Sequence, residues 1–256
     1  MTAGKAGRWL AAALGLGVWL ATVPAEARDL TVGVEAIDFT PVYSWRDGEF
    51  HGAAREILDA FATARGHHLV YRAYPIKRLL AELIHGGIDL KFPDSPDWQA
   101  AMRRGAALSY SAPVIAYVDG TLVRRERVGQ GGAALRSLGT VAGFTPLAWR
   151  EQIADGTVTL TENPGFEPLL RQVAAGRIDG AYANVAVGLT AAAQIGPTVA
   201  LAYDPALPHI ADSYRLSSGT APEVIAEFDA WLKENRALVA AIIARTGAEA
   251  GIHSGH

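Results

Sequence analysis

A helix, a glycine and a short strand follow one another twice in this chain, and this repeat restricts the folds that it can adopt. The first copy covers residues 79–92, where apolar residues at helical spacing precede Gly86 and an apolar run typical of a buried strand. Residues 169–182 align with it without a gap and place Gly176 at the same position. Glycine ends a helix readily because it adopts the left-handed conformation without steric cost. Two such α/β units predict a protein of two related lobes, with chance similarity as the alternative.

Polar loops follow both strands of the repeat and are the first candidates for a binding site. In open α/β sheets, ligands bind beyond the carboxyl ends of the strands. The loops at 93–98 and 183–186 occupy these positions, and the alignment places Asp94 opposite Asn184. We therefore expect both side chains to lie near a ligand, in a cleft between the lobes.

The first 27 residues have the three regions of a cleavable signal peptide. Lys5 and Arg8 make a basic start, and residues 9–22 are apolar but short for a membrane span. Residues 25–27, Ala-Glu-Ala, form a small-x-small cleavage site. We predict cleavage after Ala27 and export to the periplasm, with an uncleaved N-terminal anchor as the alternative. No later segment is long and apolar enough to span a bilayer, so we expect the mature protein to be soluble.

Composition and motif content argue against several classes of function. The chain contains no cysteine, which excludes disulfide bonds and a thiol nucleophile. A net charge of −3 without a basic block argues against a nucleic-acid partner. His67 and His68 are adjacent in a predicted strand and point to opposite faces, so they do not form a metal pair. Because no catalytic or phosphate-binding motif is present, we expect neither a metal nor a cofactor.

The remaining segments predict strands and helices in alternation around the two repeats. A turn is expected at Asp119-Gly120, between two separate strands. Thr145 and Pro146 are expected to open a helix as its N-cap and first residue, and residues 220–223 to form a capping box. The expected strands lie near 30–34, 69–74, 108–118, 121–124, 138–144, 157–161 and 213–217, and further helices near 53–65 and beyond 220.

The order of these elements resembles that of the periplasmic solute-binding proteins of family 3, the type that serves polar amino-acid uptake. The resemblance covers nearly all of the predicted mature chain. It is carried by Val32–Trp45, Gly86–Asp89, Tyr110–Pro113, Thr140–Thr145 and Ile178-Asp179. It implies an α/β protein with the type 2 periplasmic binding protein fold, in which each of two lobes is a sheet flanked by helices and the ligand cleft lies between them.

The resemblance also implies where the two lobes begin and end. Two segments are expected to cross between the lobes, and the lobes to close on a small solute. The crossings fall near 112–120 and 211–218. The predicted organisation is a signal peptide at 1–27, lobe 1 at 28–118 with 218–250, lobe 2 at 119–217, and a disordered tail at 251–256.

Two charged contacts of the family are missing from this chain. The family has an arginine for the ligand carboxylate, in Thr-x-x-Arg after the first-lobe strand, and Trp98 stands at that position here. The family's second-lobe aspartate, which meets the ligand amino group, falls at Asn184, and the threonine of its Gly-Thr falls at Thr145. We therefore expect a ring-bearing or cationic solute that stacks on Trp98 and Tyr43, rather than an ordinary α-amino acid.

Each candidate site residue also has a structural alternative. Lys91 lies in a predicted buried strand, so it either follows the strand end into solvent or points into the cleft, towards Asp94 or an anionic ligand. Thr145 either caps a helix or brings backbone N–H groups to an anion. The four aromatic candidates are walls of the cleft or part of a core. The predicted ligand-binding residues are Phe39, Tyr43, Trp45, Lys91, Asp94, Trp98, Thr145 and Asn184.

The sequence thus predicts a monomeric periplasmic protein that captures a small solute between two lobes and delivers it to an ABC permease in the inner membrane. No enzymatic activity is expected. Two alternatives remain open. One is a dehydratase-like enzyme of the same fold, in which Lys91 and Asp94 do acid–base work. The other is a sensory or accessory binding module without a permease.

Overall fold

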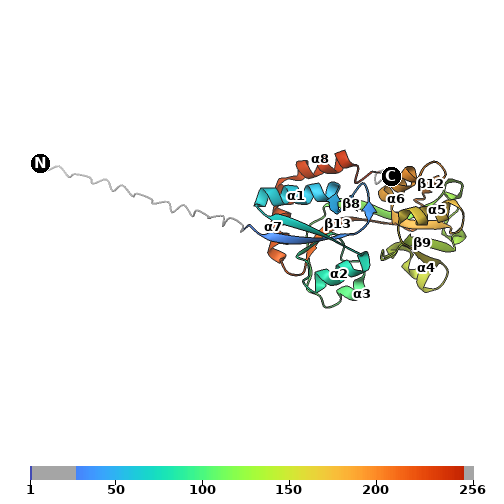
Figure 1. Cartoon of the computed structure of the whole chain (residues 1–256), viewed down its shortest axis with the longest axis horizontal. Coiled ribbons are helices and arrows are strands. Elements are labelled where there is room, and N and C mark those ends of the chain that lie inside the picture. The colour runs from blue at the N-terminus through green and yellow to red at the C-terminus, as the bar shows by residue number, and fades with distance from the viewer. Residues whose placement is uncertain (2–26, 251–256) are drawn as a thin grey trace.

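The computed structural model describes Met1 and residues 27–250 of the chain. Residues 2–26 and 251–256, which hold nearly all of the predicted signal peptide and the predicted tail, lie outside the described residues. The described chain is built on a sheet of ten strands that runs through two groups of helices (Figure 1). Within this part of the chain, no helix has both the length and the apolarity needed to cross a bilayer.

Eight strands form the continuous path of the sheet, and each end of the path is a parallel trio. The strands are β1 (Asp29–Glu35), β5 (His68–Tyr74), β6 (Leu90–Asp94), β8 (Ile115–Arg124), β9 (Ser137–Val141), β10 (Thr159–Asn163), β11 (Gly180–Asn184) and β13 (Ile210–Ser218). Their order is β5-β1-β6-β13-β8-β11-β9-β10. The strands β5, β1 and β6 run parallel at one end, and β11, β9 and β10 at the other. Each trio with its helices is called lobe 1 and lobe 2 below.

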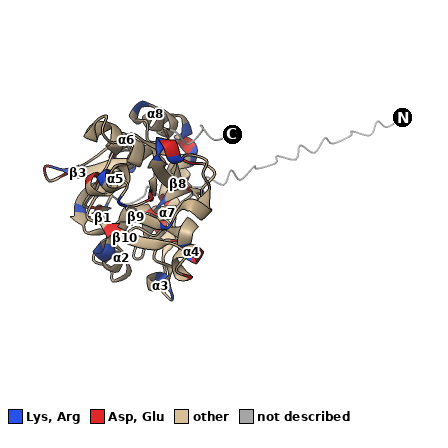
Figure 2. Ribbon diagram, turned by 90° about the vertical axis from the view of Figure 1, so that its right-hand side faces the viewer, with Lys and Arg blue, Asp and Glu red and all other residues tan. Residues whose placement is uncertain are grey.

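Helices gather at the two ends of the sheet (Figure 1). Lobe 1 carries α1 (Ala53–Arg65), α2 (Ile76–Ile84), α3 (Ala100–Arg103), α7 (Pro222–Glu234) and α8 (Arg236–Thr246), and lobe 2 carries α4 (Arg150–Ala154), α5 (Phe166–Ala174) and α6 (Val185–Ile195). A small sheet of β2 (Asp38–Phe39), β3 (Tyr43–Arg46) and β4 (Glu49–His51) belongs to lobe 1, while β7 (Ser109–Tyr110) pairs with β13 and β12 (Leu201–Tyr203) with β8. Charged residues of both signs are spread over the elements of both lobes (Figure 2).

The sequence repeat is also a repeat of contacts. In both copies the helix is followed by a glycine in the left-handed conformation and then by a strand. Asp89 accepts a hydrogen bond from the backbone N of Thr31 in β1 at 2.7 Å, and Asp179 accepts one from the backbone N of Ser137 in β9 at 2.8 Å. The two aspartates therefore hold the neighbouring strand in the same way in each lobe, which is a structural role.

In each lobe a glycine of the sheet lies against two side chains of the repeat, Leu79 of α2 with Ile88 in lobe 1 and Leu169 of α5 with Ile178 in lobe 2. A Cβ atom added to Gly33 of β1 would lie 2.3 Å from Cδ1 of Ile88, and one added to Gly139 of β9 would lie 2.4 Å from Cδ1 of Leu169. Ile88 and Leu169 themselves belong to the two copies of the repeat. The repeat thus fixes the distance between sheet and helix as well as the order of elements.

The strands β8 and β13 cross between the lobes and pair with each other in antiparallel fashion (Figure 1). The predicted turn at Asp119-Gly120 is wrong, because β8 is one strand from Ile115 to Arg124. A Cβ atom added to Gly120 would lie 2.5 Å from Cε2 of Tyr203 in the adjacent strand β12. Glycine at this position therefore permits close packing within the sheet and does not form a turn.

Two predicted helix starts also differ in the structure. Thr145 and Pro146 do not open an α-helix, because the backbone N of Leu147 bonds to the carbonyl of Thr145 at 2.8 Å and a short 3₁₀ segment precedes α4. At α7 the proline is the first helical residue, but no capping box forms. Instead, Oγ of Ser218 accepts a hydrogen bond from the backbone N of Ala221 at 2.8 Å.

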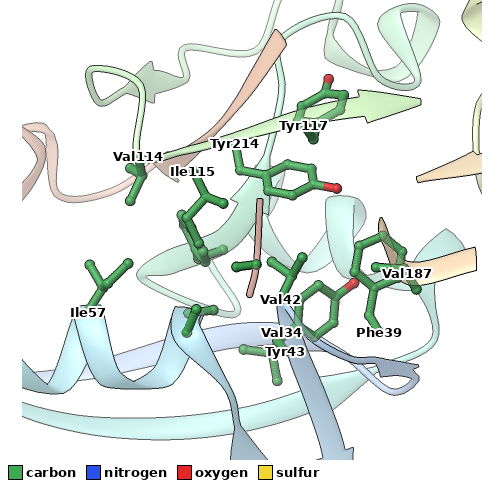
Figure 3. Packing of buried hydrophobic residues seen from close by; sticks show 14 of the residues in the cluster. Val34, Phe39, Val42, Tyr43, Ile57, Val114, Ile115, Tyr117, Val187 and Tyr214 are labelled. Carbon is green, nitrogen blue, oxygen red and sulfur yellow. The ribbon is translucent and has the colours of Figure 1, made fainter. Parts of the chain in front are cut away.

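The hydrophobic core extends to the boundary between the lobes, where its side chains are aromatic. Figure 3 shows Tyr117 and Tyr214 on the crossing strands, close to Phe39 and Tyr43 of the small sheet. The rings of Tyr117 and Tyr214 stack with centroids 4.3 Å apart, and those of Phe39 and Tyr43 stack at 4.9 Å. All four residues belong to one buried cluster that also reaches α1 and α5. Rigid aromatic surfaces therefore stand where the lobes meet.

Candidate ligand-binding site

A pocket lies between the lobes, at the carboxyl ends of β1, β6 and β11. This is the position at which open α/β sheets bind their ligands. Lobe 1 contributes Glu35, Phe39, Tyr43, Ile76, Lys91, Pro93, Trp98, Gln99 and Arg103; lobe 2 contributes Gly143, Phe144, Thr145, Tyr182, Ala183 and Asn184; and the crossing strands contribute Asp119 and Tyr214. Any solute in the pocket therefore contacts both lobes.

Asp94, at the end of β6, is a fully buried carboxylate that gathers charged groups behind the pocket wall. It accepts hydrogen bonds from Nη2 and Nη1 of Arg103 at 2.6 and 3.0 Å and from Nζ of Lys91 at 2.8 Å. Oγ of Ser217 donates a further bond at 2.6 Å. Burial by itself raises the pKa of Asp94, but Lys91 and Arg103 outweigh it and hold the pKa below its ordinary value. Asp94 is therefore the ionised counter-charge of two cations.

Lys91 and Arg103 reach the pocket wall while they remain bound to Asp94. Nζ of Lys91 also donates to the carbonyl of Pro93 at 2.5 Å and lies 5.4 Å from the ring centroid of Trp98. Of the two expected arrangements of Lys91, the structure shows the one directed at Asp94, because β6 continues past Lys91. Arg103 also donates from Nε to the carbonyl of Trp98 at 2.6 Å. Most donors of both cations are thus already engaged.

Glu35 is the last residue of β1 and brings a second buried carboxyl group to the pocket. The hydroxyl of Tyr43 donates a hydrogen bond to it. Burial raises the pKa of Glu35, and the ammonium group of Lys91 offsets only part of this effect. Glu35 is therefore held by a neutral tyrosine, while Lys91, the cation that acts on it, is shared with Asp94.

Asp119 lies on β8, opposite Asn184 of β11 and Ile210 of β13, and lines the pocket. Burial is the main reason why the pKa of Asp119 rises to about 7, and the carboxylates of Asp212 and Glu35 raise it further. Its carboxyl group makes no hydrogen bond or ion pair with the described part of the chain. The crossing strand thus brings an uncompensated acid into the pocket.

Aromatic rings from both lobes form the apolar walls. Trp98 packs edge-on against Tyr214, with ring centroids 5.8 Å apart. Phe39 of lobe 1 lies 5.7 Å from Phe144 of lobe 2, again edge to face, and 6.5 Å from Tyr214. Apolar walls with a few placed polar groups are typical of small-molecule sites.

Polar contacts also join lobe 2 to lobe 1 and to the crossing strand β13 around the pocket. Nζ of Lys77 in α2 donates to Glu162 in β10 at 2.8 Å. Nδ2 of Asn184 donates to the hydroxyl of Tyr214 at 2.9 Å, while its Oδ1 accepts from the backbone N of Val187 and so caps α6. The lobes are therefore closed on each other in this structure.

Six of the eight predicted ligand-binding residues line the pocket: Phe39, Tyr43, Lys91, Trp98, Thr145 and Asn184. The other two do not. Asp94 lies behind the wall, where it holds Lys91 and Arg103. Trp45 is half-buried and packs against the core of lobe 1. Contact of any of these residues with a ligand stays a prediction.

Some residues that shape the pocket escaped the sequence analysis, among them Glu35, Arg103 and Asp119. Glu35 carries a usable signal, because it directly follows the first predicted strand, 30–34, at the end where ligands bind. Arg103 follows Trp98 by five positions and donates to its carbonyl, so the wall does contain an arginine near the place where the family has one. Asp119 carries no such signal, because Asp-Gly is typical of a turn.

The chemistry available in the pocket is that of charge recognition and proton exchange. Across the described residues, no group of three or more histidine, aspartate or glutamate side chains is arranged to hold a metal ion. Lys91 and Arg103 are neutralised in part by Asp94. Glu35 and Asp119 remain as acids with raised pKa values, the kind of group that marks a functional pocket.

No protein-family model matches the sequence, and no curated protein matches it. Solved structures do match. An amino-acid ABC transporter substrate-binding protein from Streptococcus pneumoniae, bound to L-arginine, is 18% identical with a TM-score of 0.67, covering 85% of this chain and 94% of its own. A histidine kinase sensor domain with similarity to periplasmic binding proteins is 21% identical with a TM-score of 0.68, covering 86% and 95%.

A third matching structure is an ancestral amino-acid-binding protein described as a precursor of cyclohexadienyl dehydratase. It is 15% identical with a TM-score of 0.67, covering 85% of this chain and 94% of its own. These likenesses confirm the predicted α/β fold with two lobes, the periplasmic binding protein fold, over most of the chain. They agree with the predicted resemblance to amino-acid-type solute-binding proteins.

Proposed function

We propose that this protein binds a small solute between its lobes in the periplasm and delivers it to a membrane ABC permease. The observation that carries the proposal is the pocket, because its walls come from both lobes and from the strands that cross between them. A solute in this place contacts both lobes at once, so its binding free energy favours the closed arrangement. A permease can then distinguish the loaded protein from the empty one by its shape.

The fold and the predicted targeting segment support this function. The pneumococcal structure supports transport, since that protein belongs to an amino-acid ABC transporter and holds L-arginine. The predicted hinge segments, 112–120 and 211–218, overlap β8 and β13, which supports a rotation of the lobes about these two strands. The predicted signal peptide supports export.

Capture and closure are tested on the protein purified from the periplasm. Mass spectrometry of the small molecules released on denaturation should identify a retained compound. Small-angle scattering on the ligand-depleted protein should give the mass of a monomer, and the radius of gyration should fall when the compound is returned. An unchanged radius at saturation contradicts closure.

Delivery is tested by deleting the gene and measuring cellular uptake of the same compound, which should fall. Normal uptake together with tight binding favours a sensory or accessory module instead, a role that the matching kinase sensor domain makes a concrete alternative. Incubation of the compound with the protein separates the remaining alternative. Loss of water from the compound would indicate a dehydratase-like enzyme, a possibility raised by the dehydratase precursor.

A further inference from the structure

Asp119 presents a carboxyl group to the pocket without a partner in the described chain. It lies in the middle of β8, between β11 and β13, so the backbone cannot swing the side chain out to bulk water. Asp119 is half-buried, and a half-buried ionised carboxylate is stabilised by a positive group or by hydrogen-bond donors beside it. No described side chain supplies them, so they come from whatever occupies the pocket, which is water in the empty state or a bound solute.

The cations of the pocket wall are not available to Asp119. Lys91 and Arg103 both bind Asp94, with N–O distances of 2.8 and 2.6 Å, and Lys91 also acts on Glu35. When these five groups are ionised, two positive charges face three negative charges. With all five groups ionised, the pocket thus carries an excess of one negative charge, which one bound cation would neutralise.

The titratable groups that face Asp119 are acids and phenols. They are Asp212 and Tyr214 on β13, Tyr182 on β11, Tyr117 on β8, Glu35 on β1 and Tyr43 on β3. The four tyrosines stay neutral because burial raises their pKa values. Burial, followed by the two neighbouring carboxylates, raises the pKa of Asp119 to about 7.

We propose that the solute is a small organic cation, and that Asp119 receives its positively charged group and gives up a proton in exchange. The inference rests on the proposed binding function. Phe39, Tyr43, Trp98 and Tyr214 surround the site with ring faces and edges, which favour a guanidinium or substituted ammonium group with an apolar body. A strongly hydrated inorganic ion fits such walls poorly, and no metal-binding cluster occurs among the described residues.

Cation binding and ionisation of Asp119 are thermodynamically linked. A cation favours the ionised carboxyl, so its affinity should rise with pH through the pKa of the empty site. With a pKa of about 7, the ionised fraction of Asp119 rises from about 0.1 at pH 6 to about 0.9 at pH 8. A probe whose own charge is constant should therefore bind about tenfold more tightly at pH 8, and release about half a proton at pH 7.

Probe pairs that differ in charge but little in shape test the inference on the mature chain. The pairs are arginine with citrulline, lysine with norleucine, and choline with 3,3-dimethylbutanol, together with any cation retained on purification. Calorimetry in phosphate and in Tris measures affinity and proton release. At least one cation should bind at least tenfold more tightly than its neutral isostere. Asp119→Asn should abolish both the preference and the proton release.

Asp212→Asn is the matched control, because it removes a neighbouring carboxyl that does not line the pocket. It should keep the preference for cations. Circular dichroism should show that both variants are folded. Equal binding of cations and isosteres, an unaffected Asp119→Asn variant, or a retained compound that is neutral or anionic would overturn the inference and leave the binding function standing. If no solute of any charge binds, both fail.

Discussion

Asp94→Asn tests most directly how lobe 1 holds its charged groups. Asp94 binds Lys91 and Arg103, whose side chains are only 4% and 8% exposed, and it also accepts from Ser217. Asparagine keeps the shape of the side chain but leaves two buried cations without a counter-charge. Removal of one partner from a buried ion pair costs about 3–5 kcal/mol. We expect a loss of this size in the free energy of unfolding.

Urea unfolding followed by circular dichroism at pH 7 measures this loss. Asp97→Asn is the control, because it removes an exposed carboxylate three residues away and should change the free energy of unfolding by less than about 0.5 kcal/mol. A loss below about 1 kcal/mol for Asp94→Asn would refute the view that Asp94 balances two buried cations.

The pH dependence gives a second check on Asp94. Against the effect of burial, Lys91 and Arg103 hold the pKa of Asp94 below its ordinary 3.8. An acid with a lowered pKa stabilises the folded protein above its unfolded-state pKa, and this contribution is lost as the pH falls through the folded-state pKa. The difference between wild type and Asp94→Asn should therefore be complete above about pH 5 and shrink in more acidic solution. A difference that stays constant down to acid unfolding would count against this assignment.

Three further predictions concern other parts of the molecule. Asp119→Asn should raise the free energy of unfolding of the ligand-free protein by about 4 kcal/mol at pH 8 and by less than about 1 kcal/mol near pH 4, because the carboxyl ionises above pH 3.8 in the unfolded chain but only above about pH 7 in the folded protein, so its cost builds up between these two pH values; equal gains at both pH values in urea titrations would contradict this. Gly33→Ala and Gly139→Ala should each cost about 1–3 kcal/mol, because the added methyl overlaps a side chain at 2.3 and 2.4 Å; variants as stable as wild type would disprove the close packing. Phe39→Ala should weaken the compaction that ligand causes, measured by scattering, more than Lys77→Gln does. Lys77→Gln removes only the exposed ion pair with Glu162, and such a pair contributes at most about 1 kcal/mol. A larger effect of Lys77→Gln would contradict this.

The repeat made most of the fold predictable, because its contacts are encoded by residues at fixed spacing. The equivalent roles of Asp89 and Asp179, each bonded to the neighbouring strand, follow from that spacing. The predictions that were wrong concern residues whose conformation depends on contacts with distant parts of the chain. Asp119-Gly120 has the composition of a turn, but Gly120 is pressed against Tyr203, more than eighty residues later. No local pattern reports such a contact.

The same distinction applies to the pocket. Loops that follow the predicted strands supplied several lining residues, because the rule for open α/β sheets places ligands there. Asp119 and Tyr214 line the pocket only because β8 and β13 pair with each other, with Ile115 opposite Tyr214. That pairing joins segments about a hundred residues apart, and the apolar patterns of the two strands do not specify it.

The two lobes share an architecture, but among the described residues only lobe 1 has a buried ionic group beside the pocket. Because this group does not extend across to lobe 2, the lobes can separate without breaking it. Asp94 and its partners Lys91 and Arg103 belong to β6 and α3, so the whole ionic group stays together on lobe 1 when the lobes separate. At the equivalent position lobe 2 has Asn184, a neutral cap. Opening therefore leaves no buried cation without its carboxylate, which would cost several kcal/mol. Asp119 is different, because no side chain of the described residues pairs with its carboxyl group when the lobes are closed. Under the proposal above, a cationic solute supplies this partner. Cationic solutes should therefore hold the lobes together better than neutral or anionic ones.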